Sequence, residues 1–70
     1  MKRRDLLQRL RDAASEADLE FTSLRNRGGH EVFSLDGLRI AIPNHREIAD
    51  GTARSIMRQA AAKLGEEWWT

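Results

Sequence analysis

Apolar residues recur along residues 3–17 with the spacing of one helix face. They are Leu6, Leu7, Leu10, Ala13 and Ala14. Their spacing of i, i+1, i+4, i+7 and i+8 forms one stripe along a helix, and polar residues occupy the other faces. No proline or glycine interrupts the segment. The pattern therefore predicts an amphipathic helix over residues 3–17, with its apolar stripe facing a core.

A second helical pattern lies near the end of the chain. Its apolar positions are Ala53, Ile56, Met57, Ala60 and Leu64. Asp50 is a candidate N-cap, because a carboxylate accepts hydrogen bonds from the free N–H groups of the first turn and suits the positive helix end. Gly65 is placed to end the helix, because glycine tolerates the conformation of a C-terminal cap. We expect a helix over residues 51–64 and a short tail over residues 65–70.

Between the two helices, Asp36-Gly37 separates two segments in which apolar and polar residues alternate. Asp-Gly favours a two-residue type I′ hairpin turn, whose twist matches the flanking strands. Strands are therefore predicted over about residues 30–35 and 38–43, with Leu35 opposite Leu38. The face that must cover the core carries Phe33, Leu35, Leu38, Ile40 and Ile42. The opposite, open face carries His30, Val32, Ser34, Arg39 and Ala41.

Residues 19–25 have a weaker extended pattern and are predicted as a further strand. Residues 26–29 then form a turn, because the two glycines supply the positive φ that tight loops require. The order is helix, three strands, helix, which indicates an α+β fold in a single domain over residues 1–70. We expect a three-stranded antiparallel sheet with both helices packed on one face. The other face is left to solvent or to a partner.

The composition limits how such a chain is stabilised. A chain of 70 residues buries only about 60% of the surface that its unfolded form exposes. It has no cysteine and two histidines, so we expect no disulfide, no metal site and no cofactor. Association with a second copy or with a partner chain is the expected source of further stability. No apolar stretch approaches the ~20 residues of a membrane span, and we expect a cytoplasmic protein.

The net charge is +1, but the charges are unevenly distributed. Residues 1–11 hold five basic side chains against one acid, and residues 51–65 hold three basic side chains and no acid. Such a distribution permits a basic face for an anionic partner, although a solvated mixed surface is the favoured interpretation on charge alone. The same two interpretations apply to Arg54 and Arg58, which lie one helical turn apart, and to Arg3 and Arg4.

Several segments resemble a known family when they are taken together and in order. They are MKRRDLLQRLRDA, RGGHEVF, IPNH and GTARSIMRQA. Over residues 1 to about 62 the chain resembles HicA toxins, the mRNA interferases of HicA–HicB toxin–antitoxin modules. Its element order is also similar to that of a double-stranded-RNA-binding domain. The resemblance implies an endoribonuclease of mRNA that a HicB-like antitoxin neutralises.

The same resemblance maps the essential histidine of the family onto His30. The family pattern at this point is Gly-Ser-His, often with a second histidine after it, whereas this chain has Gly28-Gly29-His30-Glu31. The serine and the second histidine are both absent. A non-catalytic RNA- or protein-binding module of the same fold is therefore the alternative function.

The chemistry of metal-independent RNA cleavage also suits an exposed histidine. It needs a base for the 2′-OH proton, an acid for the leaving 5′ oxygen, and positive charge near the phosphate. An imidazole can act in either proton transfer, because its ordinary pKa, about 6.5, lies near physiological pH. Arg27 and Arg39 are candidates for the positive charge, and the N–H groups of Gly28 and Gly29 for phosphate contact. The alternative interpretations are that Gly28 and Gly29 form a plain hairpin turn and that His30 is a surface histidine without a role.

Two other features leave their roles open. His45 is interpreted as a loop residue or a contact to the second helix rather than as a catalyst. Trp68 and Trp69 can stack on bases or bind a partner, but packing of the tail over a helix is the favoured interpretation.

Overall fold

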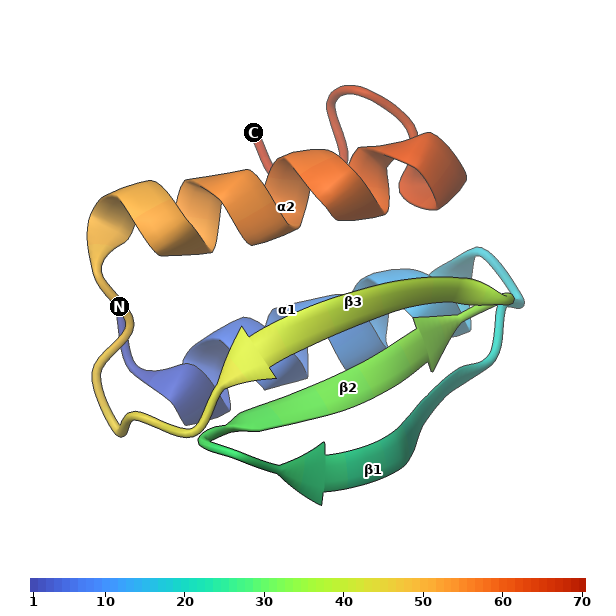
Figure 1. The fold of residues 1–70 in the computed structure, drawn as a ribbon. Helices are drawn as coiled ribbons and strands as arrows, with labels where there is room; N and C mark the ends of the chain where they lie inside the picture. The colour runs from blue at the N-terminus through green and yellow to red at the C-terminus, as the bar shows by residue number, and fades with distance from the viewer.

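The computed structural model describes all of residues 1–70, with a helix at each end of the chain and a sheet between them (Figure 1). In chain order the elements are α1 (Arg3–Glu16), β1 (Phe21–Arg27), β2 (His30–Leu35), β3 (Leu38–Pro43) and α2 (Asp50–Leu64). The strands form an antiparallel sheet in the order β1-β2-β3. The predicted α+β fold is confirmed. Neither helix is long and apolar enough to cross a membrane.

The β2–β3 hairpin has the register that the Asp-Gly turn predicts. Leu35 is paired with Leu38, and the pairing continues to His30 and Pro43 without a shift. Asp36 and Gly37 have φ angles of 50° and 89°, and a type I′ turn requires positive φ at both positions. The predicted division of the hairpin into a core face and an open face is therefore confirmed.

One hydrophobic core joins both helices to the same face of the sheet. Its largest fully buried side chains are Phe33, Leu6, Leu10, Leu35, Ile40, Ile42 and Ile56. Leu38, next to the turn, is only partly buried but still packs against the core. The ring of Phe21 on β1 stacks on that of Phe33, with 4.8 Å between the ring centroids. These contacts fix the sheet against the helices and leave its other face uncovered.

The first strand lies two residues later than predicted. Leu19 and Glu20 lie in the connection between α1 and β1, where the Leu19 N–H donates to the Ala14 carbonyl of α1 at 2.8 Å. At its other end, β1 continues through Asn26 and Arg27, which are paired with β2. The prediction of a turn over residues 26–29 is therefore wrong at its first two residues. The turn consists of the two glycines alone.

The ends of α2 match the sequence patterns in part. The predicted N-cap at Asp50 is wrong: Ala49 is the N-cap, no side chain caps the helix, and Asp50 is the first helical residue. There its charge still suits the helix N-terminus. Gly65 follows the last helical residue with a φ of 96°, the type of conformation that the predicted helix end requires.

The tail turns back against the helices. The Trp68 indole Nε1–H donates to the Met57 carbonyl on α2 at 2.8 Å, and the Arg9 guanidinium on α1 donates to the Trp69 carbonyl at 3.1 Å. Both indoles are partly buried against the core. The favoured interpretation of the tail, packing over a helix, agrees with these contacts.

Candidate nucleic-acid interface

His30 is the first residue of the central strand and is exposed on the open face of the sheet. It is paired with Arg27 on β1 and with Pro43 on β3. The predicted orientation of His30 away from the core is therefore confirmed. Its position at the end of the sheet leaves the imidazole open to an extended ligand.

The turn before His30 depends on its two glycines. Gly28 and Gly29 have φ angles of 61° and 83°, whereas the space around both is open, because an added Cβ would meet no atom within 4 Å. Backbone conformation rather than lack of room therefore calls for glycine here.

The loop after β3 holds this turn in place. The Asn44 N–H donates to the Gly29 carbonyl at 2.9 Å, and the Asn44 side-chain amide donates to Asn26 Oδ1 at 2.5 Å. These two bonds fix the backbone immediately before His30. The sequence patterns assigned no role to Asn44, because its partners are fixed only by the meeting of two loops.

The structure brings together only some of the predicted site residues. Arg27 lies directly across from His30, and Gly28 and Gly29 connect the two. Arg39 is instead paired with Ser34, four residues along β2 from His30. That separation corresponds to about 13 Å at the rise of a β-strand. Arg39 shares the open face but belongs to its opposite end.

A small hollow lies beside Arg39. It has a volume of about 160 Å³ and is lined by Leu24, Arg25, Val32 and Arg39. Leu24 is the one large hydrophobic side chain that is strongly exposed, at 50%. It lies in an irregularity of β1 between Ser23 and Arg25, where two residues stand opposite one on β2.

The sequence patterns did not indicate Arg25 as a site residue. Arg25 is paired with Val32, the next residue after His30 on the open face of β2. The signal was available, because a two-residue turn at Gly28-Gly29 sets Arg25 opposite Val32. No local pattern indicates the bulge at Leu24. Arg25, Arg27 and Arg39 carry the positive charge of the open face, and its strand positions hold no acidic residue.

A polar network supports the His30 end of the sheet from the helix side. Glu31 accepts hydrogen bonds from the Arg3 guanidinium and from the Ser23 hydroxyl, both at 2.6 Å. The Arg3 Nε–H also donates to the Pro43 carbonyl at 2.8 Å. Glu31 thus points to the face opposite His30, as its strand position predicts. The Ser23 hydroxyl, followed by Arg3, lowers the pKa of Glu31 below its ordinary value.

This arrangement offers proton transfer by one imidazole, positive charge from Arg27, and backbone N–H groups at a fixed turn. The His, Asp and Glu side chains form no group of three that could hold a metal ion. Metal-independent chemistry stays a prediction, and the catalytic and phosphate-binding roles stay proposals.

Comparison with known proteins adds the family. A family model described as "HicA toxin of bacterial toxin-antitoxin" matches residues 15–62. Curated proteins and solved structures give no match. The matched range begins inside α1, contains the whole sheet with its Gly28-Gly29-His30 segment, and ends near the end of α2. Since it covers more than half of the chain and agrees with the ordered motifs, the chain belongs to the HicA toxin family of bacterial toxin–antitoxin systems.

Proposed function

We propose that this toxin is an endoribonuclease that cleaves mRNA with His30 as the proton-transfer group, and that a HicB-like antitoxin neutralises it. The supporting observation is the exposed His30 beside Arg27 and a fixed glycine turn, in a chain of the HicA toxin family. An open sheet face without acidic side chains suits the approach of a polyanion.

The proposed reaction uses the 2′-OH of the substrate. A base removes its proton, the oxygen attacks the adjacent phosphorus, and the bond from phosphorus to the 5′ oxygen breaks as that oxygen takes up a proton. His30 is the only histidine on the open face, so it serves one of these transfers and water serves the other. Arg27 stabilises the negative charge that gathers on the phosphate oxygens.

The test compares cleavage of a fluorescent single-stranded RNA by the parent, His30→Ala and His45→Ala. His45 is the matched control, because it is the other exposed histidine and lies in the loop after β3. General acid–base catalysis contributes roughly 10²–10⁴-fold, so His30→Ala should lose at least about 100-fold in rate while His45→Ala keeps it. A folded His30→Ala variant that cleaves like the parent would refute the mechanism.

The substrate provides an independent check. An oligonucleotide with 2′-deoxyribose throughout lacks the nucleophile and should not be cleaved at all. In cells, induced expression of the parent should arrest growth and degrade mRNA, and co-expression of the antitoxin should prevent both. Expression of His30→Ala should leave growth unchanged.

A specific observation favours the alternative, a non-catalytic binding module. Glu31 stands where the family often has a second histidine, and its side chain is engaged with Arg3 and Ser23 on the far side of the sheet. The open face therefore presents a single proton-transfer group. RNA that is bound with equal affinity by the parent and by His30→Ala, and recovered intact from both, would favour this function.

A further inference from the structure

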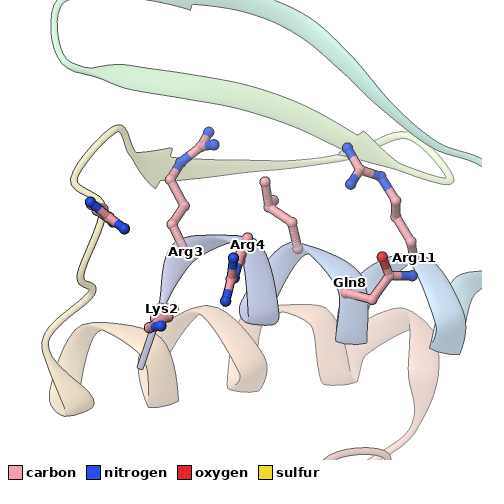
Figure 2. A pocket seen from close by; sticks show the side chains of 7 residues that line it. Lys2, Arg3, Arg4, Gln8 and Arg11 are labelled. Atoms are coloured by element: carbon pink, nitrogen blue, oxygen red, sulfur yellow. The ribbon is translucent and has the colours of Figure 1, made fainter.

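A basic groove lies on the helix side of the molecule, away from the open face. It has a volume of about 360 Å³, and five cationic side chains line it together with Gln8 and buried Leu7. The five are Lys2, Arg3, Arg4, Arg11 and Arg46. No acidic side chain is among the lining residues. Figure 2 shows Arg3 and Arg11 extending from α1 towards the sheet.

Most of this positive charge is not neutralised within the chain. Lys2, Arg11 and Arg46 take part in no ion pair. Arg4 lies 3.7 Å from Asp5, but both side chains are largely exposed and such a pair is weak. Only Arg3 is firmly paired, with Glu31. The groove therefore holds like charges close together, and an anionic ligand would relieve their repulsion.

The groove is built from two segments that the backbone holds together. The Arg3 N–H donates to the Arg46 carbonyl at 2.9 Å, and the Ile48 N–H donates to the Met1 carbonyl at 2.7 Å. The loop that carries Arg46 is thus fixed beside α1. Arg4 and Arg11 are seven residues apart, about 10.5 Å along the helix axis, so the groove is longer than a single phosphate group.

Arg3 connects this groove to the His30 end of the sheet. It bonds to Glu31, the neighbour of His30, and to the carbonyl of Pro43, the cross-strand partner of His30. The start of α1, the start of β2 and the end of β3 lie at the same end of the molecule (Figure 1). A chain held at His30 can therefore pass around this end of the sheet and reach the groove.

We infer that the groove binds the phosphate backbone of single-stranded RNA next to the cleavage site. This inference rests on the proposed function for the identity of the substrate. Cations without shaped apolar contacts recognise phosphates whatever the base sequence. Leu7, the one hydrophobic lining residue, is only 6% exposed, so the groove lacks the apolar centre typical of a protein interface. The family match starts at residue 15 and contains only Arg46 of the five cations.

The test measures binding of a fluorescent single-stranded 12-mer RNA in the His30→Ala background, which prevents cleavage. The groove variant carries Arg11→Gln and Arg46→Gln. Its matched control carries Arg54→Gln and Arg58→Gln, two exposed arginines of α2 outside any ion pair. We expect at least tenfold weaker binding for the groove variant at low salt. The slope of log K against log salt should fall by about 1.4, at 0.7 for each lost phosphate contact. The control should change neither quantity.

The result that overturns the inference is a folded groove variant with the affinity and salt slope of its parent. Loss of antitoxin binding with unchanged RNA binding would also overturn it, because the groove would then serve an acidic protein segment. The proposed function fails separately. A parent chain that binds RNA through the groove but never cleaves it refutes the nuclease and keeps the groove. Conversely, if the RNA is cleaved by His30 but neither cleavage nor binding changes when Arg11 and Arg46 are replaced, the nuclease function stands and the groove inference is refuted.

Discussion

At the scale of single residues, two short turns decide where the His30 side chain points. Gly28-Gly29 ends just before it, and Asp36-Gly37 sets the register of β2 against β3 from the other end. Both turns have two residues with positive φ. Because side chains alternate along a strand, the six-residue β2 then has His30, Val32 and Ser34 on the open face.

The first prediction concerns Gly29, the residue before His30. Its φ of 83° is strained for any residue with a Cβ, so Gly29→Ala should lower the free energy of unfolding by about 1–2 kcal/mol. Gly51→Ala is the control, because Gly51 lies within α2 with open space around it and without positive φ. Alanine there should be neutral or stabilise by up to about 1 kcal/mol. Urea unfolding followed by circular dichroism measures both, and equal effects would contradict the argument.

At the scale of elements, α1 is attached to the sheet by more than apolar packing. Arg3 donates to Glu31 and to the Pro43 carbonyl, and the Ser23 hydroxyl on β1 donates to the same carboxylate. The Arg3 and Glu31 side chains are each only 19% exposed. The network thus joins the first turn of helix α1 to all three strands of the sheet.

Acid should weaken this attachment. The pKa of Glu31 is lowered in the folded chain by the hydrogen bond from Ser23 and then by Arg3, so folding favours the ionised carboxylate. Its stabilisation is fully present above the ordinary pKa of a glutamate and is lost as the pH falls through the lowered pKa. Glu31→Gln should therefore lower the free energy of unfolding by about 1–3 kcal/mol at pH 7. The difference in unfolding free energy between this variant and the parent should vanish in acid.

Urea unfolding of the parent and of Glu31→Gln across a pH series measures this difference. Glu16→Gln is the control, because Glu16 is exposed on α1 and outside any ion pair. It should leave the pH dependence of the parent unchanged. If the difference in unfolding free energy between the parent and Glu31→Gln stayed constant from neutral to acid pH, the proposed role of the ionised Glu31 in this network would be wrong.

At the scale of the whole molecule, the sheet separates two kinds of surface. One face is sealed by α1 and α2 around a single core, and the other face is uncovered and positively charged. The near-neutral total of +1 conceals this separation, because acidic residues lie elsewhere. The basic groove adds charge next to the His30 end of the sheet, because Arg3 in its lining bonds to Glu31, the neighbour of His30. An anionic ligand therefore meets positive charge on both sides of that end.

Adjacent residues of β2 should differ strongly in their effect on stability. Phe33 is 2% exposed and stacks on Phe21, so Phe33→Ala should cost about 3–5 kcal/mol. A domain of this size has a total stability of about 3.5–10 kcal/mol, so this loss is a large share of the free energy of unfolding. Val32→Ala on the open face should cost about 1 kcal/mol or less.

Thermal and urea unfolding of the two variants tests the separation of the faces. Phe33→Leu keeps most of the buried volume and provides a folded comparison if Phe33→Ala does not fold. It should lie between the parent and Phe33→Ala in unfolding free energy. A loss from Val32→Ala that matches the loss from Phe33→Ala would mean that both faces are packed.

The sequence by itself determined the elements and the division of the hairpin into faces. Helical periodicity and the Asp36-Gly37 turn depend on residues close together in the chain, so both can be predicted without knowledge of any tertiary contact. The exposure of His30 follows from the same register. The errors at Asp50 and at residues 26–29 concern element ends, where one or two backbone groups decide the boundary.

Only the tertiary structure decided which distant side chains meet. Arg3 contacts Glu31 and Pro43, 28 and 40 residues away, and Trp68 reaches Met57 across the end of α2. Arg39 and His30 share a face but not a site, since the length of the strand separates them. The groove exists because the core holds α1 and the Arg46 loop side by side. These long-range contacts depend on how the apolar faces of the helices and the sheet pack against one another. The spacing of residues within a single element does not specify this packing.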